Sequence, residues 1–268
     1  RQMCIRDRAR TVFDTVDLHY LRERRGAEVA GDAGLLRAAE RTRASELAVM
    51  EQCDVTVLVS AAEREQLQAD APSVQVELIS NLHDVAGAGK SFEQRHDLVF
   101  VGGFRHPPNL DAMEWFIGEV FAGIRARLPE VRLHCIGAAT PESLLALAAR
   151  QPGVQMHGFV EDITPYMDGA RISIAPLRFG AGVKGKINLS MAHGQPVVGT
   201  TCAVEGMHLH PGQDVLVADD AAGFADAVVR LYQDPQLWQQ LSDAGLANIA
   251  EHFSLDAARA TVQRVFFT

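Results

Sequence analysis

The residue types best suited to chemistry gather in one short segment of the chain. Residues 176–186 hold three glycines and three cations, and they lie between an apolar segment and a segment of helical character. The whole chain has three lysines against 22 arginines, and two of these lysines, Lys184 and Lys186, lie in this segment. Glycine-rich backbone amides, a helix N-terminus and nearby cations together bind anions. We therefore expect an anion-binding loop here, with a bare solvated loop as the alternative.

A second loop, Gly102-Gly103-Phe104-Arg105, follows another apolar segment. Paired glycines let the backbone approach a phosphate closely, and Arg105 offers a planar fork of donors. The loop is not the dinucleotide-binding fingerprint, because no third glycine opens the helix that follows. A phosphate contact and a tight turn that needs glycine explain this loop equally well.

Two further places carry weaker signals. In residues 200–207, Glu205 is able to accept hydrogen bonds from hydroxyl groups, although an ordinary exposed loop explains it as well. Near the N-terminus, Asp14, Asp17 and His19 come at the end of a predicted strand. A carboxylate and an imidazole at such a place can position an acceptor hydroxyl or assist a proton transfer. A structural role in the loop is the alternative there.

The elements that must position these loops alternate along the second part of the chain. Apolar, β-branched segments predict strands at 98–101, 131–136, 154–157, 171–175, 196–199 and 215–218. Helices are predicted from about residue 110 and at 142–149, 186–193, 222–232, 235–252 and 255–266. This alternation predicts a doubly wound parallel sheet, in which ligands bind at the carboxyl ends of the strands.

The first part of the chain has fewer elements. Strands are predicted at 9–17, 54–60 and 74–79, a helix at 35–52, and a second helix that Ser60 caps. We expect residues 1–90 to be a partial, acceptor-side Rossmann-like domain without its first strands, in which residues 1–8 look like translated cloning sequence. Residues 91–268 form the expected donor-binding domain, and the polar stretch 85–94 is the expected linker.

The composition excludes several classes of protein. The chain has 268 residues, 47% of them apolar and 22% charged, which is typical of a globular protein. A net charge of −9 argues against a general nucleic-acid-binding surface. No apolar run reaches the roughly 18 residues that a membrane span needs, and the scattered cysteines lack the spacing of a metal site. We expect a cytoplasmic protein, and a peripheral position at the inner face of the membrane stays open.

Several motifs, taken in order and spacing, resemble those of a known family. Residues 97–253 are similar to the donor-nucleotide domain of GT-B glycosyltransferases of the retaining family 4 type. The motifs are Phe-Val-Gly-Gly-Phe-Arg-His-Pro-Pro-Asn (100–109), His-Gly-Phe-Val-Glu-Asp (157–162), the glycine-rich segment (175–186), Met-Ala-His-Gly-Gln-Pro-Val-Val (191–198) and Val-Glu-Gly-Met (204–207). Residues 11–84 resemble the latter part of the acceptor domain, through Phe-Asp-Thr-Val-Asp-Leu-His and Val-Ser-Ala-Ala-Glu.

The resemblance implies two Rossmann-like domains, the N-terminal one incomplete here, that hold a nucleotide-diphosphate sugar between them. The donor would be a UDP- or GDP-sugar, the acceptor a glycan or a lipid-linked molecule, and the setting polysaccharide or cell-envelope synthesis. Neither a tightly bound cofactor nor a metal is implied, and no nucleic-acid partner. The N-terminal domain is the part expected to meet a membrane.

The resemblance also assigns roles to residues. Those expected around the diphosphate are Gly102, Gly103, Arg105, Arg178, Gly182, Val183 and Lys184. Those expected around the base are Gly158, Phe159 and Val160, with Glu205 as a further nucleotide contact. The expected catalytic residues are Arg105 and Lys184, from the resemblance, together with Asp17 and His19, from their side-chain chemistry at a strand end. We expect Lys184 to contact the β-phosphate and Lys186, nearer the helix interior, to matter less.

One position departs from the pattern of the family. Leu189 stands where many members carry a glutamate that holds the ribose, and a leucine side chain makes no hydrogen bond. Leu189 and the missing first strands favour one alternative to a transferase, a non-catalytic nucleotide-binding module. A sugar-nucleotide epimerase on the same architecture is a second alternative. Turnover separates them, because an epimerase would release an isomer or a free sugar without an acceptor.

Overall fold

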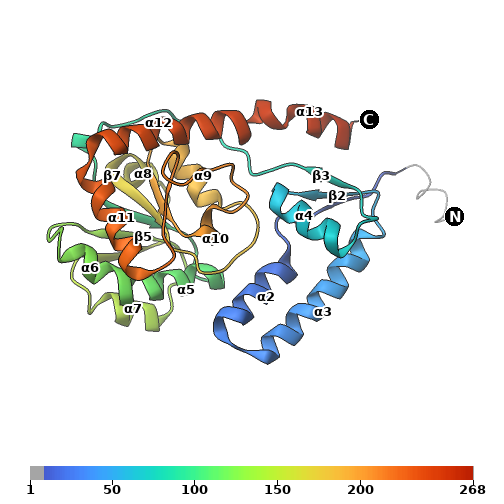
Figure 1. The fold of residues 1–268 in the computed structure, drawn as a ribbon, viewed down its shortest axis with the longest axis horizontal. Helices are drawn as coiled ribbons and strands as arrows, with labels where there is room; N and C mark the ends of the chain where they lie inside the picture. Colours follow the sequence, from blue (N-terminus) through green and yellow to red (C-terminus); the bar gives the residue numbers. More distant parts are fainter. Residues whose placement is uncertain (1–8, 268) are drawn as a thin grey trace.

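The structure is a computed structural model that describes residues 9–267, so the segment 1–8, interpreted above as cloning sequence, lies outside the described residues. Each half of the chain builds its own parallel sheet (Figure 1). The elements of the first half are β1 (Val12–Asp14), α2 (His19–Ala30), α3 (Ala33–Met50), β2 (Val55–Leu58), α4 (Ala61–Asp70) and β3 (Val76–Leu78). The three strands pair in the order β1-β2-β3.

The second half forms a six-stranded parallel sheet in the order β6-β5-β4-β7-β8-β9. Its strands are β4 (His96–Val101), β5 (Leu133–Ile136), β6 (Val154–Gly158), β7 (Ala170–Ala175), β8 (Val197–Gly199) and β9 (Leu216–Val217). Its helices are the 3₁₀ turn η1 (Phe92–Gln94), α5 (Pro107–Trp115), the π-helical turn η2 (Phe116–Val120), α6 (Phe121–Arg125), α7 (Glu142–Ala148), α8 (Thr164–Gly169), α9 (Gly185–Ala192), α10 (Thr201–Val204), α11 (Ala221–Gln233), α12 (Pro235–His252) and α13 (Leu255–Phe266). Because β4 lies inside the sheet and the chain winds outward from it in both directions, the predicted doubly wound sheet is confirmed.

Side chains alternate between the two faces of this sheet. Leu98 and Phe100 of β4 pack in the layer that holds α5, η2, α6 and α11, whereas Val99 and Val101 pack beside α8. The predicted apolar stripe of the first covering helix is fully buried and consists of Met113, Phe116, Ile117, Val120, Phe121 and Ile124. Because helices cover both faces, the strands are apolar along their whole length, which makes them recognisable in the sequence.

Three helices, α2, α8 and α10, have no clear signal in the sequence. The residue that precedes α2, Leu18, has no side chain able to cap a helix. Carboxylates from two other helices do so instead, because Glu63 accepts from the Leu18 N–H at 2.8 Å and Glu46 from the Tyr20 N–H at 2.9 Å. Helices α8 and α10 are too short to show a helical period. Helix α10 occupies part of the segment 200–207 that we expected to be a loop.

The expected linker, residues 85–94, is fixed to the second half of the molecule. Its Ala86 N–H donates to Ala192 O at 2.9 Å. Arg95, which directly follows it, is fully buried and donates to the carbonyl oxygens of Lys90, Met167, Ala170, Ala88 and His193. The guanidinium group therefore replaces its water shell with backbone acceptors and ties the linker to β7 and α9.

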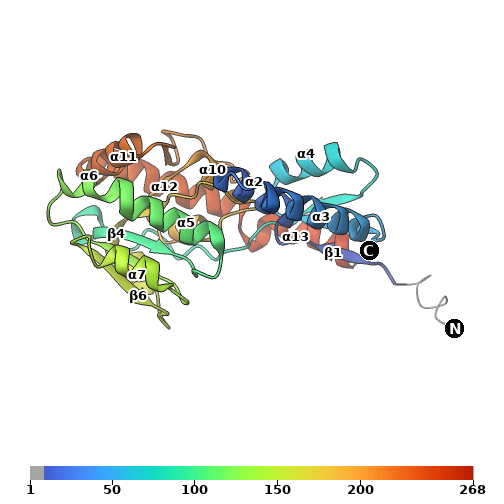
Figure 2. The same ribbon diagram turned by 90° about the horizontal axis from the view of Figure 1, so that it is seen from below.

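The last two helices join the halves. Helices α12 and α13 follow one another along one side of the molecule, α12 on the second half and α13 on the first (Figures 1 and 2). On α13, Val265 packs with Val55 and Val57 of β2, and Arg264 forms an ion pair with Glu77 of β3 at 2.6 Å. Helix α13, the last helix of the proposed donor-binding domain (residues 91–268), therefore packs on the β1-β2-β3 sheet of the first half.

Two glycines allow the halves to touch. A Cβ atom on Gly182 (φ +67°) would come within 2.9 Å of the Asp17 Cβ, and one on Gly206 (φ +71°) within 2.7 Å of the Ser60 Cβ. Both residues also adopt the left-handed backbone conformation that glycine favours. Glycine is therefore required at each position for two independent reasons, the backbone angle and the neighbour across the junction.

Replacing Gly206 by alanine is expected to destabilise the protein by more than its backbone angle explains. Gly212 has the same kind of angle (φ +81°), but a Cβ there meets nothing within 4 Å, so Gly212→Ala is the matched control. We expect Gly212→Ala to lower the free energy of unfolding by about 1–2 kcal/mol. The clash with Ser60 should add ~1–3 kcal/mol in Gly206→Ala. Urea unfolding measures both, and equal losses would show that the halves do not touch at Gly206.

Candidate active site between the two halves

A cavity of about 420 Å³ lies between the halves, where the loops after β1, β4 and β7 meet. The first half contributes Asp17 and His19 to its wall. The second half contributes His106, Asn109, Val183, Lys184 and Lys186, among others. Four residues expected from the sequence, Asp17, His19, Val183 and Lys184, are thus brought together at the carboxyl ends of parallel strands, where ligands bind in such folds.

Lys186 connects the two glycine-bearing loops. Its Nζ hydrogen-bonds to Asn109 Oδ1 and lies 4.4 Å from the centre of the Phe100 ring. A Cβ on Gly102 would lie 3.0 Å from the same Nζ, so only glycine leaves room for the amine at this loop. Burial, with added repulsion from Lys184, lowers the pKa of the Lys186 amine to about 7. An anion bound beside this amine would favour its charged form.

Lys184 lines the same cavity, but its amine contacts Gly182 and not Asn109. It precedes the first turn of α9, is 7% exposed, and donates from Nζ to Gly182 O at 2.8 Å. Burial lowers the pKa of its amine, an effect that the carboxylates of Glu205 and Glu63 oppose. Within residues 9–267, neither Lys184 nor Lys186 forms an ion pair with a carboxylate. Two neighbouring lysines, one buried and one half-buried, that line a cavity without a carboxylate partner are suited to an anionic ligand.

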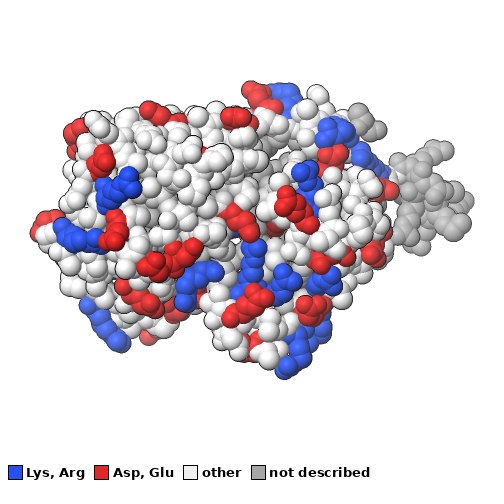
Figure 3. All heavy atoms as spheres, in the orientation of Figure 1, with Lys and Arg blue, Asp and Glu red and all other residues white. Residues whose placement is uncertain are grey.

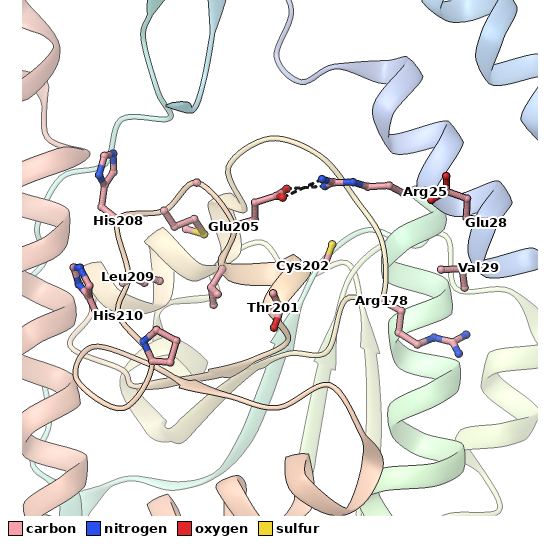
Figure 4. Close-up of a pocket in the computed structure, with 14 residues that line it drawn as sticks. Arg25, Glu28, Val29, Arg178, Thr201, Cys202, Glu205, His208, Leu209 and His210 are labelled. Atoms are coloured by element: carbon pink, nitrogen blue, oxygen red, sulfur yellow. Dashed lines mark hydrogen bonds and ion pairs between the residues drawn. The ribbon is translucent and has the colours of Figure 1, made fainter. Parts of the chain in front are cut away.

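A second cavity of about 800 Å³ also lies between the halves and contains Arg178 and Glu205 (Figure 4). Arg25 of α2 reaches across the junction, and its two terminal nitrogens donate to the Glu205 oxygens at 2.6 and 2.9 Å. Burial opposes ionisation of Glu205, but these hydrogen bonds hold the pKa of its carboxyl below the usual range. Arg178 pairs with Asp111 of α5. Glu205, expected to face ligand hydroxyls, is thus bound to an arginine of the other half.

Other expected site residues do not line either of these cavities. Arg105 and Gly103 are exposed on the loop after β4. The loop 158–160 follows the edge strand β6, and its Phe159 side chain is 79% exposed. The roles of Arg105 in diphosphate binding and of Gly158, Phe159 and Val160 in base binding stay predictions.

Two residues of the site have no role in the sequence-based assignment. Asn109 is buried at the start of α5, where its Nδ2 donates to Gly103 O at 2.8 Å while its Oδ1 accepts from Lys186. Its place beside the Pro-Pro pair at a helix start is a signal that the sequence does hold. Arg25 belongs to a charged run that is typical of a solvated helix face, so only the fold reveals its contact with Glu205.

The surface charge gives this site no strong field of one sign. On the face in Figure 3, basic and acidic side chains lie side by side near the junction of the halves. Attraction of an anion to the site therefore depends on the local cations.

Within residues 9–267, no three acidic, histidine or cysteine side chains are grouped so that they could hold a metal ion. In the same part of the chain, no helix combines the length and the apolar character that crossing a membrane requires.

Two parallel α/β sheets that face each other across cavities, with glycine- and lysine-bearing loops at their strand ends, define the GT-B class of fold. A family model for glycosyl transferases group 1 matches residues 95–234. Because this match covers more than half of the chain, the protein belongs to that family, as the motifs in its sequence indicate.

Solved structures share the fold. TarM of S. aureus superposes with a TM-score of 0.74 at 13% identity, over 85% of this chain and 46% of TarM. HepE of Anabaena, solved in complex with UDP and glucose, superposes with a TM-score of 0.72 at 14% identity, over 98% of this chain and 73% of HepE. In sequence, a 44.6 kDa protein in the cps region of Klebsiella pneumoniae is 24% identical over 164 residues, 59% of this chain and 42% of that protein. The chain therefore spans less than half the length of TarM and of the Klebsiella protein.

Burial of Lys186 predicts a specific dependence of stability on pH. Its pKa falls from 10.5 to about 7 on folding, so between these values the unfolded chain binds more protons and stability rises with pH. We expect Lys186→Met to flatten this rise, and Lys90→Met, at an exposed position, to leave it unchanged. Urea unfolding of the three proteins at about pH 7 and about pH 9 measures the effect. The same rise in Lys186→Met as in the parent would contradict the buried amine.

Proposed function

We propose that the chain carries the donor-binding part and a portion of the acceptor side of a glycosyltransferase. The enzyme moves a sugar from a UDP- or GDP-linked donor to a glycan or lipid-linked acceptor in polysaccharide or cell-envelope synthesis, with retention at the anomeric carbon. It works in the cytoplasm, and its N-terminal half meets the membrane when the acceptor is lipid-linked. Membership of the group 1 family supports sugar transfer, and the cps-region relative supports the polysaccharide setting.

The observation that carries this proposal is the position of the Lys186 amine between the loops after β4 and β7. A diphosphate placed there would meet this amine, the backbone of Gly102 and the N-terminus of α9, each of which favours negative charge. HepE, which shares the fold, is solved with UDP, which fits a nucleotide-diphosphate ligand. We therefore assign the principal diphosphate contact to Lys186, with Lys184 beside it, which reverses the order expected from the sequence.

This arrangement suits the chemistry of transfer. When the bond between sugar and diphosphate breaks, negative charge grows on the departing phosphate oxygens. Preorganised cations in a site with little water stabilise that charge more than water does, and so lower the barrier. Lys186 and Lys184 are held in such a place by Asn109 and Gly182. The proposal needs no metal, because these cations take the part that a metal plays in other transferases.

Removing the Lys186 amine is expected to weaken UDP binding more than removing any other lysine. We expect Lys186→Ala to raise the dissociation constant by about 10- to 100-fold, the loss of one charge-assisted hydrogen bond. Lys184→Ala should raise it by about ten-fold and Lys90→Ala should leave it unchanged. UMP, which lacks the β-phosphate, should be affected less than UDP in both site variants. Isothermal titration calorimetry measures these constants.

An unchanged affinity for UDP in Lys186→Ala would contradict the assignment of the diphosphate site. Turnover then separates the activities that remain open for a protein that binds UDP. Transfer from a UDP-sugar to an acceptor identifies a transferase, whereas an isomer or free sugar without acceptor identifies an epimerase. Tight binding without either product would identify the non-catalytic module that Leu189 leaves open.

A further inference from the structure

The ring of His19 is held on one side by two carboxylates. Glu46 of α3 places its Oε1 2.9 Å from His19 Nδ1, and the same oxygen accepts the His19 backbone N–H at 3.2 Å. Asp17 Oδ1 lies 3.5 Å from the same Nδ1, and this buried oxygen has no hydrogen-bond partner within the described residues. Both carboxylates therefore face Nδ1 and leave the other ring nitrogen, Nε2, unoccupied by them.

This contact determines where the ring proton lies. An ionised carboxylate only accepts hydrogen bonds, so Nδ1 must carry the hydrogen in its contact with Glu46. In the neutral ring, Nε2 then holds a lone pair, and it forms no hydrogen bond with any residue that the structure describes. His19 lines the same cavity as Lys186 and Asn109. The cavity wall therefore holds both the His19 Nε2, which accepts a hydrogen bond, and Lys186, the proposed phosphate contact.

Glu46 is well placed to keep this arrangement fixed. Its side chain is 11% exposed, and its second oxygen accepts the Tyr20 N–H at 2.9 Å. The carboxylate is thus held by the start of α2 while it contacts the His19 ring. In contrast, the His19 side chain is 46% exposed, and without Glu46 its ring would keep only the longer contact with Asp17 at 3.5 Å.

We propose that Glu46 is a positioning residue, which selects the Nδ1–H tautomer of His19 so that Nε2 accepts a hydrogen bond from a sugar hydroxyl. The hydroxyl is the fitting partner because the phosphates of a nucleotide sugar carry acceptor oxygens, whereas its sugar and its acceptor carry O–H donors. The identity of this ligand rests on the proposed function. The tautomer itself does not.

A purely structural role for Glu46 is the competing explanation, because it also caps α2. The chain offers a matched control for that role. Glu63 of α4 caps the same helix start through the Leu18 N–H at 2.8 Å, yet it makes no hydrogen bond to the His19 ring. Glu63→Ala therefore removes a cap of α2 and leaves the ring contact in place.

Long-range ¹H–¹⁵N spectra of the imidazole nitrogens in the whole chain test the proposal, with His19→Gln used to assign the signals. At a pH where the ring is neutral, we expect the parent protein to show a protonated Nδ1 and an unprotonated Nε2. Glu46→Ala should shift the ring toward the Nε2–H form, and Glu63→Ala should not. A parent protein with the Nε2–H form would overturn the proposal without any variant. So would an unchanged tautomer in Glu46→Ala, or an equal shift in Glu63→Ala.

UDP titration separates this inference from the proposed function. Because the lysines of the phosphate site lie in the other half, Glu46→Ala should bind UDP within about two-fold of the parent. If Glu46→Ala lost both UDP binding and the Nδ1–H tautomer of His19, the cavity would have collapsed, and this result would count against a positioning role. If the parent protein itself fails to bind UDP while the tautomer is as expected, the proposed function falls and the role of Glu46 in orienting His19 stands.

Discussion

The burial of two lysine amines next to each other is the constraint on which the rest of this site depends. Lys184 and Lys186 line the cavity between the halves, and among the described residues the Lys186 amine contacts the Asn109 amide oxygen and the Phe100 ring. Keeping such groups from water disfavours their charged forms, as the lowered pKa of both amines reflects. A dianionic ligand would stabilise the charged forms of both amines, and this would offset the unfavourable free energy of placing them side by side.

The same constraint explains why the halves must be held closely together. The wall around the amines is made of loops from both sheets, and any gap would admit water and weaken every electrostatic contact inside. Glycines at 182 and 206 remove side chains from the junction, Arg25 bonds Glu205 across it, and α13 packs on the sheet of the first half. The contacts that join the halves are thus also the contacts that enclose the cavity lined by Lys184 and Lys186.

The parts of this fold that the sequence predicts are those set by local patterns. The apolar strands of the second sheet, the buried stripe of the helix after β4 and the helix cap at Ser60 all follow from nearby residues. Helix α2 is not predictable from nearby residues, because the carboxylates that cap it, Glu46 and Glu63, lie far along the chain. The residues of the glycine-rich loop predict an anion site, and their spacing alone ranks Lys184 above Lys186. Only the fold shows that a side chain in the first turn of α9 points back toward the loop after β4.

Proton uptake on nucleotide binding tests the central claim, that a diphosphate recharges a buried lysine. At about pH 8, an amine with a pKa near 7 is mostly neutral, and an anion beside it should raise that pKa and draw a proton from the buffer. Calorimetric titration with UDP in buffers of different ionisation enthalpy measures the number of protons bound. We predict net uptake by the parent protein and its loss in Lys186→Met. Binding of UDP without proton uptake, or the same uptake in Lys186→Met, would contradict the account.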